Sequence, residues 1–549
     1  MPGGGHLPLV AFGNQNRVIS GNPDMTFFYK VFKRFTHFSQ ESITILMDGP
    51  NEMSLDTPIR VRAKIPRHAD LLSDLTLVFS VPDIYSKIYE EYAPSFRWIH
   101  MLGAFIISSV GIYIGGSKVQ EFPGEWIALR AQMDMSIDKY SKWRSMVGDT
   151  PEMHTPERGL YGKSQNYPYD TGAYPHNVQD PSGSATAPSI PTREIRVPLP
   201  FWFADSIGKA LPLVSLQLHE VEIQITFRSL REIYRIMDYA VNKEPNRYGV
   251  SLGVIPTGEN IPIPNPNFPI SIDPLDPSAC DNLTLQANYS PYIDISSGLL
   301  RTFYSADGTS PINQDGFIMN AHLEGNYIYI TDKERQLFAQ REIATLVHQI
   351  QTFQYPGIVS RTKFDIDAHN LVHRIVFFAR RSDAIPARND YLNMTNWKYS
   401  GQAPYYPINN PAYTPNSGKL LPYGQRDILR TARLVCAGTE LFEEKPAMYF
   451  ELQNPLATST GGGMNALNPG VRPDDVMGPI YQIPFAFHAS DHEQPSGSLN
   501  SSRLREFQLE VNPWTLDPGT QFVYDFTVYI ESLNLVKFTN GMGGMAFAV

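Results

Sequence analysis

One apolar pattern occurs twice in this chain, at positions separated by about half of its 549 residues. The first copy, Arg196–Phe227, has an aromatic block at 199–203 and a strict alternation of apolar and polar residues at 221–227. The second copy has its block at 483–487 and its alternation at 504–511. A period of two over such a length predicts a half-buried β-strand. The repeat therefore predicts two β-domains of one kind in tandem.

Length and composition agree with a large all-β protein. A length-based estimate gives about three or four domains, but two all-β domains of roughly 200–250 residues fit as well. Charged residues make up 18% of the chain, whereas proline (45 residues) and aromatic residues (12%) are abundant. Many strands joined by proline-rich loops would produce this balance. It also fits a surface that is buried against partners, and composition does not separate that possibility from a large aromatic core.

Changes in composition divide the chain into four parts. Residues 1–24 are rich in Gly and Asn and are predicted to form an N-terminal arm. Residues 25–230 are predicted to form the first β-domain. Residues 231–316 contain a proline-rich run with few backbone donors and are interpreted as a linker and insertion. Residues 317–549 are predicted to form the second β-domain, which ends in an apolar, glycine-rich tail.

A few helices and long loops are expected between the strands. Helical spacing predicts a helix over Trp126–Arg144, and a capping-box pattern at Thr331–Glu334 predicts another over Asp332–Gln340. The segment Ala344–Phe353 is ambiguous between helix and strand. Polar, proline-rich excursions too long for simple connections are predicted to be exposed loops at 148–193, 383–425 and 455–479.

Neither a membrane span nor a secretory signal is predicted. The segment Trp98–Ile114 is apolar, but its glycines and its terminal alternation favour strands buried in a sandwich. The N-terminus lacks the charged and apolar regions of a signal peptide, and Pro2 stands where myristoylation requires glycine. Two cysteines, Cys280 and Cys436, cannot form a disulfide framework. These features predict synthesis in a reducing, cytoplasmic compartment.

No direct nucleic-acid binding is predicted from the charge pattern. The net charge is −10, and the densest group of cations is Lys30–Arg34. Three cations among aromatic residues are too few to follow a phosphate backbone.

Motifs that suggest enzymes lack the context that their chemistry needs. Gly249–Gly253 matches a nucleophile-elbow pattern, but its flanks are polar and proline-rich rather than a strand and a helix. Gly162-Lys163-Ser164 resembles the end of a phosphate-binding loop, but Glu157 stands where the first glycine is needed. No catalytic or cofactor-binding residue is therefore predicted.

Histidine and acidic residues form two groups of side chains that can ligate metals. His369 and His373 are four residues apart on a predicted strand, and residues 488–493 contain a cluster: His488, Asp491, His492 and Glu493. Both groups are interpreted as surface polar residues, so no metal site is predicted. Glycosylation sequons occur about as often as chance predicts, at Asn282, Asn288, Asn393 and Asn500.

Five ordered segments resemble the major capsid proteins of large icosahedral double-stranded DNA viruses. Gly21–Ile43 resembles the N-terminal signature of that family, and Val197–Ile223 resembles the motif at the end of its first barrel. Thr331–Gln340 resembles the start of its second barrel, and Pro495–Leu504 and Asn540–Ala548 resemble its C-terminal motifs. In many members an aromatic residue stands in the Pro495–Leu504 motif where this chain has serine.

The resemblance implies an all-β fold with two tandem jelly-roll barrels and a structural role in a virion capsid. It implies no enzyme activity and no cofactor, and assembly as a homotrimeric capsomer. Three chains with two similar barrels each would present six similar lobes around a three-fold axis and could tile a hexagonal lattice. The implied partners are further copies of the chain, neighbouring capsomers, minor capsid and penton proteins, and an internal membrane layer reached by the N-terminal arm.

Two other functions remain open at this point. A carbohydrate-binding, lectin-like jelly roll is the main alternative, because Tyr- and Asn-rich stretches at 161–177 and 399–423 could stack on sugars. A glycoside hydrolase is a weaker alternative, since Asp474 and Asp475 are acidic but show no paired-carboxylate geometry in sequence.

Overall fold

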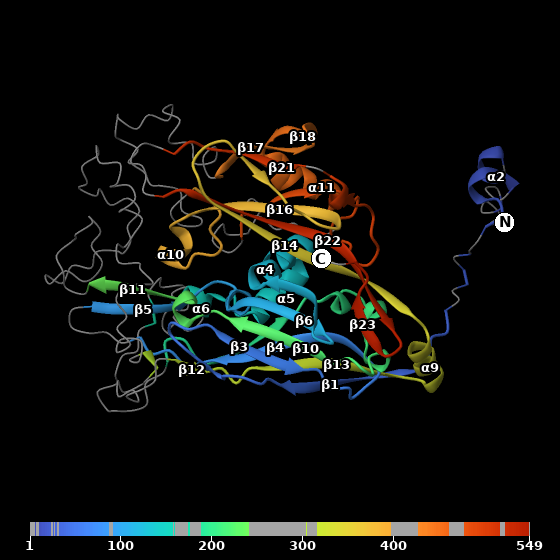
Figure 1. Ribbon diagram of the computed structural model, residues 1–549, viewed down its shortest axis with the longest axis horizontal. Coiled ribbons are helices and arrows are strands. Elements are labelled where there is room, and N and C mark those ends of the chain that lie inside the picture. Colours follow the sequence, from blue (N-terminus) through green and yellow to red (C-terminus); the bar gives the residue numbers. More distant parts are fainter. Residues whose placement is uncertain are drawn as a thin grey trace.

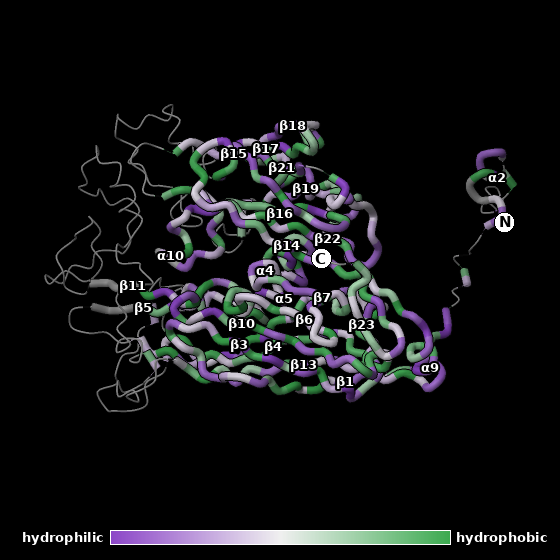
Figure 2. The backbone as a smooth tube through the Cα atoms, viewed as in Figure 1, coloured by the Kyte–Doolittle hydropathy of each residue, from purple (hydrophilic) through white to green (hydrophobic). Residues whose placement is uncertain are grey.

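The chain folds into two β-sandwiches that lie one above the other, with helices between them (Figure 1). The computed structural model describes residues 6, 10–11, 13–23, 26, 28–29, 32–86, 92–156, 159, 174–175, 188–240, 303–304, 316–396, 427–459, 477–504, 506–516 and 522–547. Hydrophobic residues follow the strands of both sandwiches and the helices at their junction (Figure 2).

The first sandwich consists of two antiparallel sheets. One has the order β1-β13-β4-β8, with β9 paired to β4, and the other has the order β3-β10-β6-β7. The bounds are β1 Phe38–Leu46, β3 Ile59–Lys64, β4 Leu71–Val81, β6 Ile107–Ile114, β7 Ser117–Pro123, β8 Arg193–Pro198, β9 Leu211–Pro212, β10 Val221–Phe227 and β13 His322–Ile330. Two short pairs flank them: β2 Glu52–Met53 with β12 Phe317–Ile318, and β5 Tyr92–Trp98 with β11 Tyr234–Ala240.

The second sandwich repeats this plan. Its sheets have the orders β14-β22-β16-β19 and β15-β21-β17-β18, with β20 paired to β16 and β23 to β22. The bounds are β14 Ile343–Ile358, β15 Thr362–Asp365, β16 Leu371–Arg381, β17 Leu429–Cys436, β18 Thr439–Pro446, β19 Tyr481–Pro484, β20 Leu499–Asn500, β21 Phe507–Pro513, β22 Tyr524–Thr539 and β23 Met542–Met545.

Both sandwiches have the strand order of a jelly roll. When the eight main strands of each are counted along the chain, the first and eighth strands are neighbours in one sheet, and the second and seventh are neighbours in the other. The seventh strands are β10 and β21, which are the two alternating strands of the sequence repeat. In β10 the apolar residues of the alternation are all buried, as a period of two predicts.

The predicted start of the second domain at residue 317 is wrong. β12 and β13 belong to the first sandwich, where β13 lies between β1 and β4, and Leu323 and Tyr327 are buried in its core. A jelly roll needs its eighth strand beside its first strand, so the chain returns to the first sheet after the insertion. The segment 231–316 therefore separates strands seven and eight of the first sandwich, rather than the two domains. Within it, Tyr234–Ala240 pairs with β5.

The helices are short, and most of them lie near the junction. Their bounds are α2 Asn14–Ser20, α3 Leu102–Phe105, α4 Gly124–Asp134, α5 Ile137–Met146, α6 Pro151–His154, α9 Asp332–Gln340, α10 Ala384–Arg388 and α11 Asn454–Thr458. Single turns occur at Trp202–Ala204 (η4), Ile207–Lys209, Leu213–Ser215, Leu230–Glu232 and Ser501–Arg503, and a π-helical turn occurs at Tyr449–Gln453.

Three predictions about these elements can now be compared with the structure. The helix predicted over Trp126–Arg144 is two helices, because Met135 and Ser136 are both extended and α5 begins only at Ile137. α9 confirms the helix at Asp332–Gln340, although the Thr331 side chain makes no capping hydrogen bond. The ambiguous segment Ala344–Phe353 is strand β14.

The apolar segment Trp98–Ile114 comprises the last residue of β5, the short helix α3 and the strand β6. This confirms strands in a buried sandwich, with a helical turn between them that was not predicted. No helix among the described residues is long and apolar enough to cross a membrane.

Candidate functional site

The helix α4 places polar side chains of the first sandwich against the second sandwich. It begins directly after β7, at Gly124, where any Cβ atom would collide with the carbonyl oxygens of Ala104 and Ile107. Glycine thus permits the close approach of α4 to α3 and β6. Trp126 packs against Tyr529 of β22, with ring centroids 5.4 Å apart. Asp134, the last residue of α4, then lies beside β16 and β22 of the second sandwich.

A buried arginine connects the two sandwiches. Arg374 of β16 is fully buried and donates both Nη atoms to Asp134, at 2.8 and 2.7 Å. Its Nε donates to Oε2 of Glu531 on β22, at 2.5 Å. One guanidinium therefore satisfies a carboxylate from each sandwich, and the bidentate pair with Asp134 fixes both distance and orientation.

The charges in this group keep one another ionised. Burial alone would raise the pKa of Asp134, but Arg374 and His492 hold it well below its usual range. The pKa of Glu531 is likewise held well below its usual range, because Arg374 and His492 outweigh its burial. Desolvation disfavours the charged form of each group, and the opposite charges at hydrogen-bond distance reverse that effect.

Two histidines contact the same carboxylates. His492 contacts Oδ2 of Asp134 through Nε2 at 2.9 Å and Oε1 of Glu531 through Nδ1 at 3.3 Å. His348 contacts Oε1 of Glu531 through Nδ1 at 2.9 Å. Burial and Arg130 lower the pKa of His492, but the carboxylates of Glu531 and Asp134 outweigh them and raise it. Burial lowers the pKa of His348 to about 4.

Further polar contacts extend across the junction. Glu125 of α4 accepts hydrogen bonds from Arg380 and from the Tyr529 hydroxyl. Gln132 exchanges two hydrogen bonds with the backbone of Met477, and Gln120 of β7 donates to the carbonyl of His348 at 2.7 Å. The arrangement can fix the relative orientation of the two sandwiches. It offers no exposed nucleophile.

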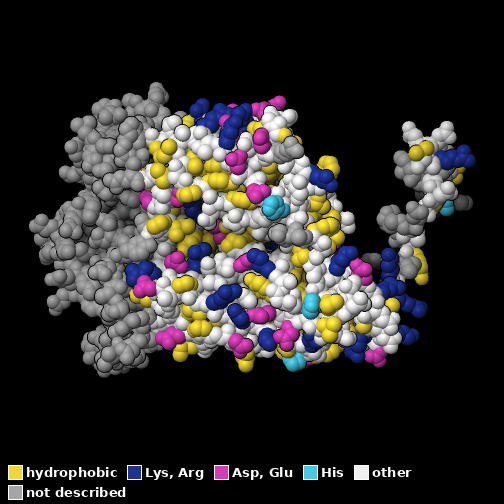
Figure 3. All heavy atoms as spheres, in the orientation of Figure 1, with side chains coloured by type: hydrophobic (Ala, Val, Ile, Leu, Met, Phe, Trp, Pro, Cys, Tyr) yellow, Lys and Arg dark blue, Asp and Glu magenta, His cyan; other side chains and the backbone are white. Residues whose placement is uncertain are grey.

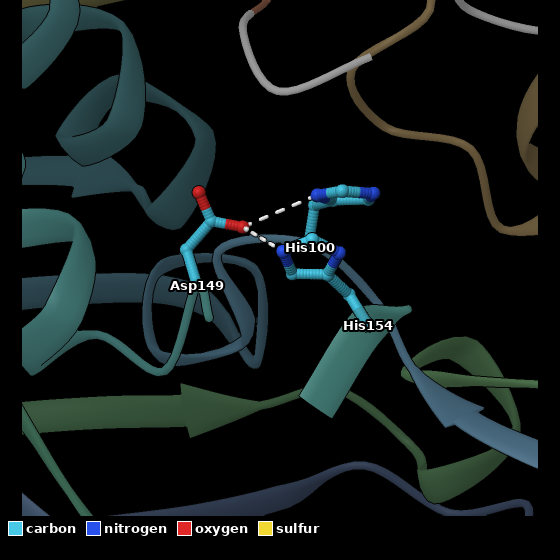
Figure 4. Close-up of side chains that lie close together, drawn as sticks. All are labelled: His100, Asp149 and His154. Atoms are coloured by element: carbon cyan, nitrogen blue, oxygen red, sulfur yellow. Dashed lines mark hydrogen bonds and ion pairs between the residues drawn. The ribbon is translucent and has the colours of Figure 1, made fainter. Parts of the chain in front are cut away.

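A second cluster of histidines and acid lies within the first sandwich (Figure 4). His100 lies between β5 and α3, Asp149 follows α5, and His154 ends α6. Oδ1 of Asp149 lies 3.2 Å from Nδ1 of His100 and 3.6 Å from Nε2 of His154. It also accepts from the backbone N–H of Met101 at 3.2 Å, while Oδ2 accepts from Nε of Arg144 at 2.5 Å.

This second carboxylate is also stabilised in its charged form. Burial would raise the pKa of Asp149, but His100, His154 and Arg144 hold it well below its usual range. Met101, whose amide points at Asp149, has a φ of 49°, in the left-handed region that non-glycine residues seldom adopt. Sequence analysis did not identify this cluster, since His100 is distant in sequence and no spacing motif connects the three residues.

The histidines considered from sequence divide into two groups. His369 and His488 are exposed, in agreement with their interpretation as surface residues. The same interpretation is wrong for His373 and His492, which are both buried. His373 lies within 3.3 Å of the carbonyl oxygens of Ala489 and Gly497, and His492 belongs to the junction. A period of two places a residue on a face of a strand, but it does not show that the outward face is covered by another sandwich.

Most other sequence candidates lie outside the described residues. These are the pattern at Gly249–Gly253, Gly162-Lys163-Ser164, Asn282, Asn288, Asp474, Asp475, Cys280, all of 399–423 and all of 161–177 except residues 174 and 175. Of the other two sequon asparagines, Asn393 is buried and accepts hydrogen bonds from Thr395, whereas Asn500 is exposed on β20. Burial raises the pKa of the Cys436 thiol to about 11.

Comparison with known families identifies the chain. The family model described as major capsid protein N-terminus matches residues 26–262. The family model described as large eukaryotic DNA virus major capsid protein matches residues 334–544. This chain belongs to the major capsid proteins of large DNA viruses. The resemblance inferred from the sequence motifs is thereby confirmed, and the protein is a structural component of a viral capsid.

Relatives and solved structures cover nearly all of this capsid protein. It is 23% identical to the probable capsid protein 4 of Acanthamoeba polyphaga mimivirus and 24% identical to the major capsid protein of Phaeocystis pouchetii virus, over 99% of each chain. Its fold matches the PBCV-1 virus capsid with a TM-score of 0.59 and 17% identity, covering 95% of this chain and 100% of that one. It matches the Faustovirus major capsid protein with a TM-score of 0.56 and 14% identity, covering 95% and 96%. The predicted double jelly roll is confirmed.

Removing the buried guanidinium should strongly destabilise the capsid protein. In Arg374→Met, the carboxylates of Asp134 and Glu531 lose their main counter-charge inside the junction, at an expected cost of about 3–5 kcal/mol in the free energy of unfolding. The matched control is Arg62→Met, which removes an exposed arginine 3.6 Å from Glu222 and should cost about 0–1 kcal/mol. Denaturant unfolding of both variants measures the difference. Equal losses would show that Asp134 and Glu531 do not depend on the buried guanidinium as their counter-charge.

Acid should destabilise the junction through His348. Its pKa is about 4 in the folded protein and 6.5 ordinarily, so between these values the unfolded chain binds a proton that the folded chain does not. The stability that the folded protein has while His348 is neutral is therefore complete above about pH 6.5 and is lost as the pH falls towards 4. His348→Gln keeps an amide donor for Glu531 and removes the titration, so its melting temperature should fall less over this interval.

The other titratable groups that face His348 are shared by both proteins. They are Glu531 on β22, His373 on β16 and His492 in the following loop. The lowered pKa of Glu531 gives stability that is lost as the pH falls below its ordinary value of 4.5, at the acid end of this interval, whereas the raised pKa of His492 gives stability that is lost as the pH rises. Comparing the two melting curves cancels these contributions. Parallel curves from pH 7 to 4 would contradict the assignment to His348.

Proposed function

We propose that this capsid protein forms a homotrimer, and that the trimer is the pseudo-hexagonal capsomer of an icosahedral shell. Two sandwiches of the same strand order in each of three chains would give six similar lobes around one three-fold axis. The main support for this proposal is the contact between the two sandwiches of one chain. Contacts between neighbouring chains can have the same form, so this contact is called the template below.

The template has two sides. On one side the first sandwich presents β7 and the turn η4 in its aromatic block, and on the other the second sandwich presents its first strand, β14. Side-chain bonds join them: Gln120 of β7 donates to the carbonyl of His348, and Gln349 of β14 donates to the carbonyl of Val119. These contacts position an edge strand of one sandwich against the side of the other.

The corresponding surfaces recur in the chain, but among the described residues they do not make this contact with each other. The counterpart of β7 in the second sandwich is β18, the counterpart of the aromatic block is 483–487, and the counterpart of β14 in the first sandwich is β1. If the intrachain contact repeats around a ring, β18 and the second block of one copy face β1 of the next copy. Six such contacts, alternately within and between chains, close a trimer.

Exposure of these counterparts agrees with such a ring. Phe203 in the first block is fully buried, whereas its counterpart in the second block, Phe487, is 80% exposed in the single chain. Strand β1 is exposed along most of its length, with Phe38 and Leu46 among the exposed large hydrophobic residues. Obligate interfaces of this type bury on the order of 2,000–5,000 Å².

Native mass tests the trimer and its interface together. Light scattering of the purified chain should give about 185 kDa, three times its 61.8 kDa, and particle images should show a hexagonal outline. Phe487→Ser should shift the protein towards the monomer without lowering its melting temperature as a monomer. The control Ile318→Ser removes an exposed residue of β12, outside the repeated contact, and should remain trimeric. A monodisperse wild-type monomer would overturn the proposal.

The N-terminal arm is proposed to bind neighbouring molecules in the shell. It extends away from the body of the protein and carries exposed hydrophobic side chains (Figure 3), of which Val10 is 81% and Val18 is 85% exposed. Phe28, Phe32 and Phe35, which follow the arm, are also exposed, so the N-terminal part of the chain has apolar surface that the described residues do not cover. Its proposed partners are neighbouring capsomers, minor capsid and penton proteins, and the internal membrane layer.

Deleting residues 1–24 should leave the trimer intact and reduce its incorporation into particles, because the deletion removes an arm without touching either sandwich. Sedimentation of assembled particles, with trimers as the internal reference, measures this loss. Full assembly of the shortened chain would contradict a role for this segment.

Synthesis in the reducing cytoplasm of the host stays a prediction that agrees with the buried, free thiol of Cys436.

A further inference from the structure

We propose that His100, Asp149 and His154 bind one divalent transition-metal ion, with zinc as the best match. The ligands would be Nδ1 of His100, Oδ1 of Asp149 and Nε2 of His154, and a water molecule would complete a tetrahedron. This inference is independent of the proposed trimer, because all three residues belong to the first sandwich of one chain. The two His nitrogens and the carboxylate oxygen form a donor set typical of zinc.

The spacing of the three atoms fits such an ion. Ligand atoms that lie about 2.0–2.1 Å from a tetrahedral zinc are about 3.3–3.4 Å from one another. Here Oδ1 of Asp149 is 3.2 Å from Nδ1 of His100 and 3.6 Å from Nε2 of His154, and all three atoms lie within 4.8 Å of one another. Both imidazole rings direct a nitrogen at the same carboxylate oxygen (Figure 4). Binding would require only small side-chain movements.

An unpartnered nitrogen is the independent observation that points to a ligand. Nε2 of His154 is buried and has no hydrogen-bond partner among the described residues, and the side chain is only 4% exposed. Its Nδ1 lies 2.9 Å from the hydroxyl of Thr155. When Nδ1 donates its proton to Thr155, the Nε2 lone pair faces a carboxylate oxygen. A metal ion between Nε2 of His154 and Oδ1 of Asp149 would accept a lone pair from each atom. The hydrogen bond from Nδ1 to Thr155 would then fix the orientation of the His154 ring.

The other contacts of the Asp149 carboxylate are made by Arg144 and the Met101 amide. Arg144 contacts the other carboxylate oxygen, Oδ2, and the Met101 amide occupies one of the acceptor directions of Oδ1. The His100 and His154 rings lie 3.8 Å apart and are inclined by only 30°. The His100 side chain is 12% exposed, which gives a route by which a metal ion and its water could enter.

The junction cluster does not offer an equivalent site. His348, His492 and Glu531 also place three potential ligand atoms within 4.8 Å. There, however, the fully buried guanidinium of Arg374 donates to the second oxygen of Glu531, and His492 also contacts Asp134. A divalent ion held by Oε1 of Glu531 would lie beside this buried guanidinium, which Coulomb repulsion opposes, whereas the Arg144 side chain at Asp149 is 20% exposed.

Bound metal would connect two parts of the first sandwich. It would tie the corner between β5 and α3 to the end of α6, through residues about 50 positions apart in the sequence. Because only the folded chain brings these residues together, metal binding stabilises the fold in proportion to the logarithm of metal concentration over the dissociation constant.

Metal content of the full-length protein tests the proposal. Protein stripped with EDTA and dialysed should bind one Zn²⁺ or Co²⁺ per chain by elemental analysis, and its melting temperature should rise when zinc is restored. The cobalt form should show the visible absorption of a tetrahedral ion. His100→Gln and His154→Gln should each lower the cobalt affinity by more than the 10–100-fold that loss of an outer partner typically causes.

The junction histidines provide matched controls. His348→Gln and His492→Gln remove buried imidazoles of the other cluster and should still bind one metal ion per chain. If wild-type protein binds no metal, or if the junction variants rather than His100→Gln and His154→Gln lose it, the proposal is wrong. Because stoichiometry is first measured on the wild-type chain, a variant that fails to fold cannot leave the question open.

Discussion

The architecture depends on burying one arginine between two carboxylates of different sandwiches. Arg374 is taken wholly out of water, and this would be very costly without Asp134 and Glu531 at hydrogen-bond distance. A buried ion pair contributes little net stability compared with well-packed hydrophobic residues, but it tolerates few alternative geometries. The pair is thus better suited to setting the angle between the sandwiches than to holding them together by force.

Apolar contacts at the junction favour association of the two sandwiches, and the ion pairs fix their relative orientation. Trp126 packs on Tyr529, and Phe105 stacks on Tyr391 with ring centroids 4.8 Å apart. Such contacts favour burial but are not strongly directional, so two sandwiches joined by them alone could slide over one another. The bidentate contact between Arg374 and Asp134 removes that freedom. In the proposed capsomer, a fixed angle between the two sandwiches would be a structural requirement.

What the sequence could predict was local. The alternation at 221–227 gave strand β10 and its buried face, and the repeat gave two domains, because a period of two and a recurring block are visible in a single segment. The sequence did not predict that β13 belongs to the first sandwich. An alternating pattern shows which side chains of a strand are buried, but it does not show which strand it pairs with. The junction left a weak signal: Arg374 and Glu531 are charged residues in the interior of mostly apolar strands. Such residues require a buried counter-charge, but the sequence does not say which one.

The two buried clusters show how the same chemistry can be completed in different ways. Each is built on a carboxylate that is fully desolvated and approached by two histidines. At the junction the positive charge comes from Arg374, which reaches Glu531 along the sheet and bridges to Asp134 across the interface. In both clusters an arginine contacts the second carboxylate oxygen: Arg374 reaches Oε2 of Glu531, and Arg144 reaches Oδ2 of Asp149. Arg374 is fully buried and also binds Asp134 of the other sandwich, whereas the Arg144 side chain is 20% exposed and its cluster lies within the first sandwich. The burial and the second partner of Arg374 therefore make the junction cluster a connection between sandwiches, and the cluster at Asp149 is the better candidate for a metal site.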